Sequence, residues 1–492
     1  MVEETAEYPA ALARSTLPGA GAWQNHRILR RLIDSVAWVT WREVAIDDLN
    51  ATATGPVLLV ANHFGGVSDA IVLMSVLPRR PRVLADDQIW KVPVIRSVMN
   101  GIGAIPVHRG NRGSTDNTDM FASAQEALAR GEMVLIFPEG ITREEPSIGK
   151  VRSGAARIAV GAREAGVKGV RIVPAGIHYE DKAAFRSAVF VREGEPIDVD
   201  AEVAKAAGGL GGSPEVVDTG GTVGDGEERS VEEHGEERRS VERLTSLIEE
   251  RLRASAPDYD DWREARALQT ASEAFLRSLE PQRPVPVGLR DRLASWLAAR
   301  EPQELTDCAD RYFSALDHTG ATDAWASQGR KLISLTRVLM AIIWVLLLPY
   351  AALGAVAWAV PALITWLVSK LRMAPAVMAT VLPLVALILF GVTTGFWLRT
   401  GWSRNRFAGI VTVALVLPVG FAAFVVVVER GLLWLRWSQN RVMTIGGRGR
   451  RLGDLRSEMV SMVADEVLAG LDIEADRGPN ETTGSATNGG VT

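Results

Sequence analysis

Apolar and polar positions follow two periods in the first half of the chain. From residue 57 to residue 200, short apolar runs alternate with longer amphipathic segments. The runs have the length of buried strands, and the segments between them have helical period. This alternation predicts an α/β fold with a mainly parallel central sheet flanked by helices. The predicted strands are Val57–Val60, Arg82–Ala85, Ala104–Val107, Met133–Phe137 and Arg171–Ala175, and the clearest predicted helices are Thr118–Ala129 and Ser153–Ala165.

A separate helical pattern precedes this region at residues 27–42. Ile28, Leu32 and Val36 fall on one side of a helix, while the charged residues fall mostly elsewhere. Such a helix can pack on the folded domain or lie in a membrane interface. The pattern leaves both interpretations open.

The composition changes after the predicted sheet. Residues 206–231 are rich in Gly, Ser, Asp and Glu with almost no aromatic content, which predicts a flexible insertion. A charged helix is predicted at 240–255, where Leu244, Ile248 and Leu252 form one apolar stripe.

Beyond Arg337 the chain carries long stretches without charge. No charged residue occurs in 338–369, 373–398 or 407–428. Crossing the hydrocarbon core of a bilayer takes about 20 apolar residues, so transmembrane helices are predicted within 337–430.

The number of membrane crossings stays open. The first run is long for one crossing and short for two, and it contains Pro349 and Pro361. Basic residues after the last run favour a cytoplasmic C-terminus, which three crossings would not allow if the α/β domain is cytoplasmic. Either the first run turns back or one run does not cross. The predicted order is a flexible N-terminal tail (1–26), an α/β domain (27–255) with its flexible insertion (206–231), a helical linker region (256–336), transmembrane helices (337–430) and a cytoplasmic tail that is first basic and then disordered (431–492).

Composition narrows the function classes. The net charge of −5 makes nucleic acid an unexpected partner. The one cysteine, Cys308, can form neither an intrachain disulfide nor a thiolate metal cluster. The histidines show no metal-binding spacing, so no metal is predicted. The N-terminus lacks a signal-peptide pattern, and we expect the α/β domain on the cytoplasmic side.

The stretch LLVANHFGGVSDAIVL, residues 58–73, places reactive side chains at a strand-to-helix turn. His63 follows the predicted strand and Asp69 begins the next helix. A histidine paired with a carboxylate activates hydroxyl groups, because the imidazole takes the proton and the carboxylate fixes its tautomer. Gly65 and Gly66 permit a tight turn without side chains that block a substrate. Taken alone, such a pair is more often structural than catalytic.

Other predicted strands end in residues that suit a binding site. Arg109 lies near the end of GIGAIPVHRG, Glu139 and Gly140 lie in VLIFPEGITRE, and Pro174 lies in RIVPAGIH. The carboxyl ends of parallel strands meet at one edge of a sheet, where open α/β sheets bind ligands. Arg109 alone fits a solvated residue and Pro-Glu-Gly alone fits a turn. Together with His63 they favour a site at this edge.

The blocks NHFGGVSD, GAIPVHR, FPEG and IVPAGI, in this order and spacing, resemble the glycerolipid acyltransferase family with its PlsC-like domain. The resemblance covers about residues 30–255. It is strongest to glycerol-3-phosphate acyltransferases of the fungal dual-substrate type, whose first block also has five residues between histidine and aspartate, where the commoner lysophosphatidate enzymes have four. Residues 185–197 and 256–271 and the apolar spans late in the chain resemble that branch as well.

The resemblance implies roles for the first two blocks. His63 is expected to be the general base, and Asp69 the carboxylate that orients it. Arg109 corresponds to the arginine that grips the phosphate of the acceptor, which suits a planar guanidinium that can make two charge-assisted hydrogen bonds.

The later blocks are expected to bind substrate. Glu139 and Gly140 correspond to the block that shapes the acceptor site, and Pro174 to the block linked with the acyl donor. Lys150 and Arg152 follow closely and add positive potential for phosphate, although a solvated basic pair fits them equally. The sequence departs from the family pattern by Ile-Thr after Gly140 and by Phe-Gly-Gly after the histidine, and both departures bear on the acceptor's identity.

The resemblance implies a membrane-bound O-acyltransferase that moves an acyl group from an acyl thioester to glycerol-3-phosphate, without metal or cofactor. Acyl-CoA or acyl-carrier protein is the expected co-substrate, and a phosphorylated glycerol and membrane lipids are the expected partners. The first alternative is a 1-acylglycerol-3-phosphate (lysophosphatidate) acyltransferase. A more remote alternative is a non-catalytic membrane scaffold with an acyltransferase fold.

Overall fold

A computed structural model of the chain divides into two compact units. The first unit holds the residues up to Asp258 together with Pro361–Val392, and the second holds Tyr259–Val360 together with Thr393–Thr492. The predicted N-terminal tail, 1–26, lies outside the described residues. The structure describes residues 27–47, 49–91, 93–108, 117–182, 186–208, 225–281, 283–319, 322–328, 335–370, short runs or single residues between 385 and 427, and 447–476.

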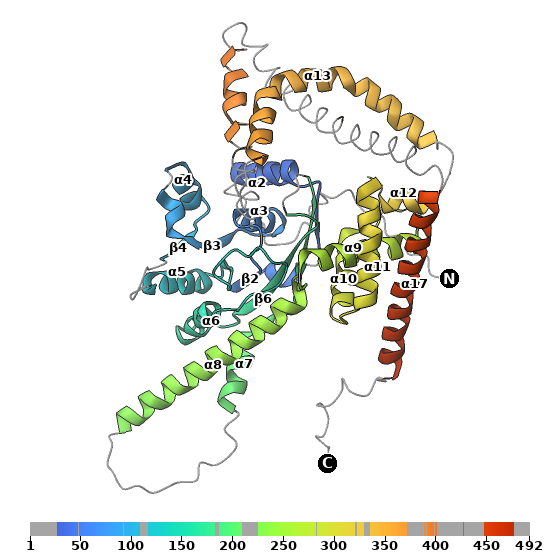
Figure 1. Cartoon of the computed structure of the whole chain (residues 1–492). Coiled ribbons are helices and arrows are strands. Elements are labelled where there is room, and N and C mark those ends of the chain that lie inside the picture. Colours follow the sequence, from blue (N-terminus) through green and yellow to red (C-terminus); the bar gives the residue numbers. More distant parts are fainter. Residues whose placement is uncertain are drawn as a thin grey trace, which may run out of the picture. The chain divides into compact units, whose positions relative to one another are not determined.

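The first unit is built on one mainly parallel sheet (Figure 1). Its strands are β1 (Glu43–Ile46), β2 (Val57–Ala61), β3 (Pro81–Asp86), β4 (Ile105–Val107), β5 (Met133–Ile136), β6 (Arg171–Tyr179), β7 (Ala188–Glu193) and β8 (Ile197–Asp198). The strand order is β1-β7-β6-β2-β5-β3-β4, with β8 beside β6. Only the pairs β6–β7 and β6–β8 are antiparallel among the described strands. The predicted fold class, a mainly parallel sheet flanked by helices, is therefore confirmed.

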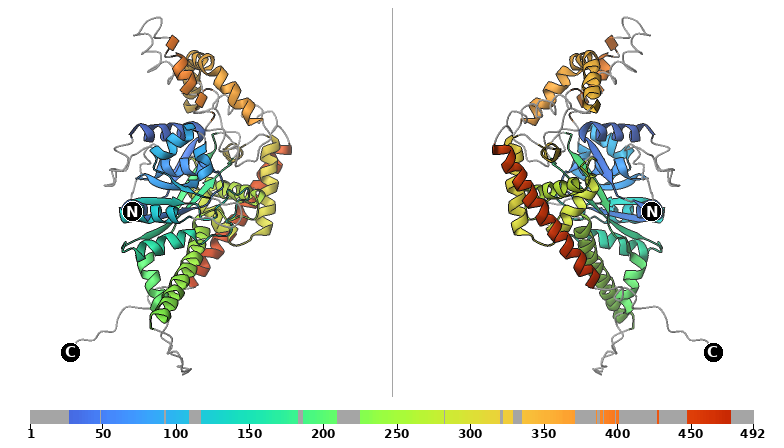
Figure 2. Two further views of the ribbon diagram at one scale, coloured as in Figure 1. Left: turned by 90° about the vertical axis from the view of Figure 1, so that its left-hand side faces the viewer. Right: turned by 90° about the vertical axis from the view of Figure 1, so that its right-hand side faces the viewer.

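Helices cover both faces of this sheet. They are α2 (Arg27–Thr40), α3 (Val67–Val76), α4 (Pro93–Gly101), α5 (Thr118–Ala129), α6 (Gly154–Glu164), α7 (Val199–Gly208) and α8 (Asp225–Ser255), with the short helices η1 (Asn50–Thr52) and η2 (Asp87–Lys91). Helices α2 and α3 pack on each other over one face, and α5, α6 and α8 lie over the other (Figures 1 and 2). Every residue of β2 is buried as a result. Two-sided burial explains why the central strands are continuous apolar runs rather than alternating ones.

Helix α2 packs against the domain through one of its faces. Ile33 is buried, and the Arg30 guanidinium donates to the carbonyl of Leu77 just past the end of α3 at 3.1 Å. The side chains of Leu32 and Trp38 are exposed. Helix α2 thus packs on the domain, as one of the two interpretations proposed. The other interpretation, that the helix lies in a membrane interface, stays a prediction.

Helix α8 is longer than its sequence pattern predicts. It begins at Asp225, inside the predicted insertion at 206–231, while residues 209–224 lie outside the described residues. Leu244 and Leu252 of the apolar stripe are fully buried against the first unit's core. The stripe therefore anchors the C-terminal half of the helix to the sheet layer.

The second unit is a bundle of helices. Its described helices are α9 (Trp262–Leu279), α10 (Val287–Ala298), α11 (Gln303–Thr319), α12 (Asp323–Gln328) and α17 (Gly447–Asp476). Leu268, Tyr312 and Met459 are fully buried in its core, and so is Cys308. The helical character predicted after residue 256 is confirmed.

Helix α17 differs from the disordered tail that the sequence predicts within 431–492. Its residues Met459 and Val463 are fully buried, because apolar positions four residues apart face α9 and α11. The Arg456 guanidinium also reaches Asp323 in α12, at 2.7 Å. Packing of one apolar stripe stabilises a helix whose overall composition is polar.

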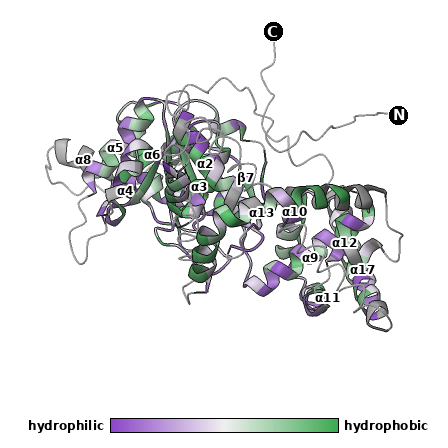
Figure 3. Cartoon of the chain, turned by 90° about the horizontal axis from the view of Figure 1, so that it is seen from above, coloured by the Kyte–Doolittle hydropathy of each residue, from purple (hydrophilic) through white to green (hydrophobic). Residues whose placement is uncertain are grey.

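Helix α13 (Leu335–Ser369) contains the first charge-free run. Its ribbon is mostly hydrophobic in Figure 3, and Val356 is 76% exposed. Within the part of the chain that the structure describes, no helix combines the length and the apolar character needed to cross a membrane. The runs at 373–398 and 407–428 lie largely outside the described residues. The transmembrane helices expected within 337–430 stay a prediction.

Candidate active site

The site begins where β2 ends. Asn62 follows this strand and is fully buried. Its side-chain oxygen accepts from the Ile177 N–H at 2.7 Å, and its side-chain nitrogen donates to the Ile177 carbonyl at 3.0 Å. Because β2 and β6 are parallel neighbours, this pair of bonds ties the two strands together at the same edge. The next residue is presented at the carboxyl edge of the sheet, where α/β sheets bind ligands.

His63 and Asp69 meet across the turn between β2 and α3. The His63 Nδ1 atom lies 2.9 Å from Asp69 Oδ2. Asp69 stands in the first turn of α3, and the Gly65 N–H points at both carboxylate oxygens, at 3.0 and 2.9 Å. Gly66 has a φ of 66°, a left-handed conformation that glycine adopts without strain. The predicted pair is therefore in direct contact.

The donors around Asp69 favour one tautomer of His63. Asp69 Oδ1 accepts from the Tyr179 hydroxyl at 2.7 Å, in addition to the Gly65 N–H. Burial and the charge of Asp69 raise the pKa of Tyr179 well above its usual value, so its hydroxyl remains a donor. A carboxylate surrounded by donors acts as an acceptor, which makes His63 Nδ1 the protonated ring nitrogen. His63 Nε2 then has a free lone pair, on a side chain that is 17% exposed.

A phenylalanine and a loop fix the position of the His63 ring and backbone. The ring stacks on Phe137, with centroids 4.1 Å apart and planes 18° apart. The backbone carbonyl of His63 accepts from the Arg143 N–H at 2.9 Å. His63 is thereby held between the turn after β2 and the loop after β5, which leaves little freedom for the imidazole.

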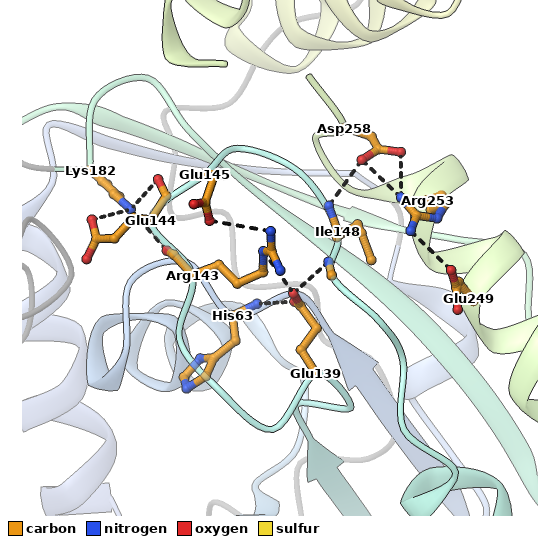
Figure 4. A network of polar contacts seen from close by, with 11 residues as sticks. His63, Glu139, Arg143, Glu144, Glu145, Ile148, Lys182, Glu249, Arg253 and Asp258 are labelled. Atoms are coloured by element: carbon orange, nitrogen blue, oxygen red, sulfur yellow. Dashed lines mark hydrogen bonds and ion pairs between the residues drawn. The ribbon is translucent and has the colours of Figure 1, made fainter. Parts of the chain in front are cut away.

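The Glu139 carboxylate lies at the centre of the polar contacts of the loop after β5 (Figure 4). Its Oε1 accepts from the His63 N–H at 3.1 Å, and its Oε2 accepts from the Gly149 N–H at 2.9 Å. Arg143 lies 3.9 Å from the same carboxylate. Burial raises the pKa of Glu139, while the two backbone N–H groups and Arg143 act in the opposite direction. The carboxylate therefore braces the loop against the backbone of His63.

Further polar contacts hold the rest of the loop (Figure 4). Lys182 is almost buried and donates to the carbonyls of Arg143 and Glu144, each at 3.1 Å. At the other end, the Ile148 N–H donates to Asp258 at 3.1 Å. The loop after β5 is thus attached at both ends to later parts of the first unit.

Comparison with known proteins identifies this region. The family model described as Acyltransferase matches residues 43–178, which include His63, Asp69 and Glu139. These residues form a PlsC-like acyltransferase domain.

The relatives of the acyltransferase domain act on glycerolipids by name. The chain is 41% identical over 86 residues to glycerol-3-phosphate O-acyltransferase 2 of Saccharomyces cerevisiae, which covers 17% of this chain and 12% of that protein. It is 25% identical over 151 residues to the chloroplastic 1-acyl-sn-glycerol-3-phosphate acyltransferase LPAT1 of Arabidopsis thaliana, covering 30% of this chain and 40% of that protein. The matches thus span less than half the length of either relative.

A solved structure also matches. The 1-acyl-sn-glycerophosphate acyltransferase PlsC from Thermotoga maritima aligns with a TM-score of 0.29 and 19% identity, over 45% of this chain and 81% of that one.

The other predicted site residues differ in their burial. Gly140 follows Glu139 and has a φ of +71°, and a Cβ built on it would lie 3.2 Å from Arg152 Nε. Lys150 and Arg152 are exposed, and Pro174 is buried inside β6. Arg109 lies outside the described residues. The substrate-binding roles of these residues, and of Glu139, stay predictions.

In the described part of the chain, the sequence pattern missed two side chains that contact the side chains of the predicted pair. Tyr179 contacts Asp69, but the predicted strand stops at Ala175 and leaves it out. Phe137 was assigned to a strand, with no sign that it stacks on His63. The available signal was the spacing of Ile177 and Tyr179, which lie two residues apart, as strand residues on one face do.

No group of three or more histidine, cysteine, aspartate or glutamate side chains able to hold a metal ion occurs among the described residues.

Proposed function

We propose that this protein is a membrane-bound O-acyltransferase that moves a fatty acyl group from an acyl thioester to the hydroxyl of glycerol-3-phosphate. The observation that carries the proposal is the His63–Asp69 contact of 2.9 Å inside a PlsC-like acyltransferase domain. The name of the yeast relative and the spacing of the first block support glycerol-3-phosphate as the acceptor.

The proposed reaction is direct acyl transfer. His63 Nε2 takes the proton of the acceptor's hydroxyl as its oxygen attacks the thioester carbonyl carbon. Asp69 stabilises the imidazolium that forms. The tetrahedral intermediate then expels the thiolate as the C–S bond breaks, and the imidazolium returns its proton to that sulfur. Backbone N–H groups or a cationic side chain stabilise the oxyanion.

The remaining residues of the proposed site bind the substrates. Arg109 grips the acceptor's phosphate. Glu139 and Gly140 shape the acceptor side, with Lys150 and Arg152 adding positive potential, and Pro174 lies on the side of the acyl donor. The donor is acyl-CoA or acyl-carrier protein, and the reaction uses neither a metal nor a cofactor.

The proposed location is a membrane, with the catalytic domain on its cytoplasmic side. The charge-free runs between residues 338 and 428 support it. Moving an acyl chain out of a bilayer costs about 0.8 kcal/mol per methylene group. An enzyme attached to the membrane avoids most of that cost.

The second candidate is a 1-acylglycerol-3-phosphate acyltransferase. The similarity to the Arabidopsis enzyme of that name, over 151 residues, favours it. Both candidates use the same base and differ in whether the acceptor already carries one acyl chain.

An acceptor panel tests the proposal. Purified full-length protein is given radiolabelled acyl-CoA or acyl-carrier protein with either glycerol-3-phosphate or its monoacylated form. We expect lysophosphatidate from glycerol-3-phosphate, and a fall of at least about a hundredfold in His63→Ala. Phosphatidate formed only from the monoacylated acceptor would select the second candidate. A folded His63→Ala variant with full activity would show that His63 is not the base. No acyl transfer by the wild type to either acceptor would favour the scaffold.

Arg109→Ala tests the phosphate assignment. We expect the KM for the acceptor to rise at least about tenfold, because a bidentate contact with a charged group is lost. The KM for the acyl donor should stay unchanged. Arg163→Ala, which removes an arginine paired with Asp200 on α7, serves as the control. A rise in the donor's KM alone would show that Arg109 does not bind the acceptor phosphate.

A further inference from the structure

Tyr179, the last residue of β6, extends the hydrogen bonding of the predicted pair. Its hydroxyl donates to Asp69 Oδ1 at 2.7 Å, while His63 Nδ1 lies 2.9 Å from Oδ2 of the same carboxylate. Tyr179 is 3% exposed and Asp69 is fully buried, so water does not compete for this bond. The three side chains form one continuous chain of hydrogen bonds from phenol to imidazole.

We propose that Tyr179 is a positioning residue for His63, acting through Asp69. The inference rests on the proposed function, because it takes His63 as the base. In the described part of the chain, the Asp69 carboxylate is bonded by His63, by the Gly65 N–H and by Tyr179. The Tyr179 hydroxyl holds Oδ1, which keeps Oδ2 turned toward His63. This hydrogen bond also partly neutralises the negative charge of Asp69, which stabilises the imidazolium form of His63.

Among the described residues, the other charged groups that hold His63 and its surroundings lie in two loops. Glu139, after β5, accepts from the His63 backbone N–H at 3.1 Å and lies 3.9 Å from Arg143. Lys182, after β6, donates to the Arg143 carbonyl at 3.1 Å. Removing the phenol oxygen of Tyr179 leaves each of these contacts in place. A difference in the titration of His63 between this variant and the wild type then reports the loss of the hydrogen bond to Asp69.

Tyr179→Phe keeps the buried ring and removes only the hydroxyl. Without this donor, the negative charge of Asp69 is less neutralised and stabilises the imidazolium form of His63 more strongly. The imidazolium cannot act as a base. We expect the acidic limb of the pH profile of kcat/KM to move to higher pH by about half a unit to one unit. We also expect kcat at the pH optimum to fall about tenfold, because Asp69 loses the bond that fixes its orientation.

Tyr312→Phe is the matched control. Tyr312 is fully buried in the second unit, and its hydroxyl donates to Asp323 at 2.8 Å. The variant loses the same kind of hydrogen bond, from a buried tyrosine to a buried aspartate, in a helix bundle without the predicted pair. A purely structural role for Tyr179 predicts the same behaviour from both variants.

The experiment compares wild type, Tyr179→Phe and Tyr312→Phe as purified full-length proteins. Thermal unfolding is measured first, and then the pH profile with the acceptor that the wild type uses. We expect both variants to lose stability and only Tyr179→Phe to shift the acidic limb. An unshifted limb in Tyr179→Phe, or an equal shift in Tyr312→Phe, would overturn the proposal.

A second readout separates this inference from the proposed function. If the wild type transfers no acyl group to any acceptor, the proposed function fails, and the pH profile is replaced by the ring ¹⁵N signals of His63. These signals are assigned by comparison with His63→Gln in ¹⁵N-histidine-labelled protein. We expect their titration midpoint to lie at higher pH in Tyr179→Phe than in the wild type and in Tyr312→Phe. Equal midpoints in all three proteins would overturn the inference.

Discussion

Position 65 has space for a hydrogen atom but not for a methyl group. A Cβ built on Gly65 would lie 2.8 Å from Asp69 Oδ1 and 2.8 Å from the Tyr179 hydroxyl. Both neighbours are buried, so neither can move aside freely. We expect Gly65→Ala to lower kcat/KM by about tenfold to a hundredfold through misplacement of Asp69, and to cost about 1–3 kcal/mol of unfolding free energy. Initial acyl-transfer rates and urea unfolding measure the two effects.

Gly101→Ala is the control for this substitution. Gly101 ends α4, and a Cβ built there meets no atom within 4 Å. We expect wild-type kinetics and a stability within about 1 kcal/mol of the wild type, because alanine is the better helix former. A folded Gly65→Ala protein that is as active as Gly101→Ala would show that the contact between Asp69 and Tyr179 is not needed for catalysis.

The sequence predicted those site residues whose partners lie close by in the sequence. His63 and Asp69 were found because a strand, a glycine turn and a helix place them within one short stretch. Glu139 was expected at the same edge, but its bonds to backbone N–H groups depend on the path of a loop that no local pattern encodes. Tyr179 was missed because the continuation of its strand past Ala175 depends on pairing with a distant segment.

At the scale of elements, the strands β2 to β6 were predictable, and β1, β7 and β8 were not. All five predicted strands are present, since continuous apolar runs between helices are a strong signal. Strand β1 has only four residues, so its sequence is too short to show the period of a strand. Strands β7 and β8 pair antiparallel with β6, which breaks the alternation that guided the prediction. These strands exist through long-range pairing rather than local preference.

The loop after β5 offers a test of how one element supports another. Glutamine has nearly the size of glutamate but offers one acceptor oxygen and one donor group. In Glu139→Gln, one of the two backbone N–H groups, from His63 or Gly149, therefore faces another donor. We expect the free energy of unfolding to fall by about 1–3 kcal/mol, because a buried donor is left unsatisfied. We also expect a lower kcat, because the hydrogen bond that holds the His63 backbone is weakened. Urea unfolding and acyl-transfer rates provide the measurement.

Glu132→Gln makes the same chemical change just before β5, at the other end of the strand. Glu132 is 36% exposed and pairs with Arg82 at 3.3 Å. Exposed pairs contribute about 0–1 kcal/mol, so this variant should unfold close to the wild type and keep its activity. Equal stability losses in Glu132→Gln and Glu139→Gln would mean that the buried bonds of Glu139 do not brace the loop.

At the scale of the whole molecule, the second unit joins segments that lie far apart in the sequence. Asp323 of α12 is 3% exposed and accepts from Arg277 of α9 at 2.9 Å and from Arg456 of α17 at 2.7 Å. Leaving a buried carboxylate without its partners is costly, so these bonds fix α17 in the bundle. Composition could not reveal this, because α17 mixes apolar and charged residues and the partners of its apolar residues lie far away in the sequence. Residues 329–446 separate α12 from α17 in the sequence.

This closure predicts the sidedness of the predicted membrane segment. Because α12 and α17 belong to one bundle, both flanks of that segment lie in one compartment, and the segment crosses a bilayer an even number of times or not at all. Two exposed serines allow a labelling test of this prediction. Ser314 lies in α11 and Ser457 in α17, and the chain has one cysteine, Cys308, which is buried.

In a Cys308→Ala background, Ser314→Cys and Ser457→Cys should react alike with a membrane-impermeant maleimide. Either both react in sealed vesicles, or both react only after permeabilisation. Cys308→Ala alone should stay unlabelled under each condition. Labelling of one position but not the other in sealed vesicles would require an odd number of crossings, and the contact between Asp323 and Arg456 could then not form within one chain.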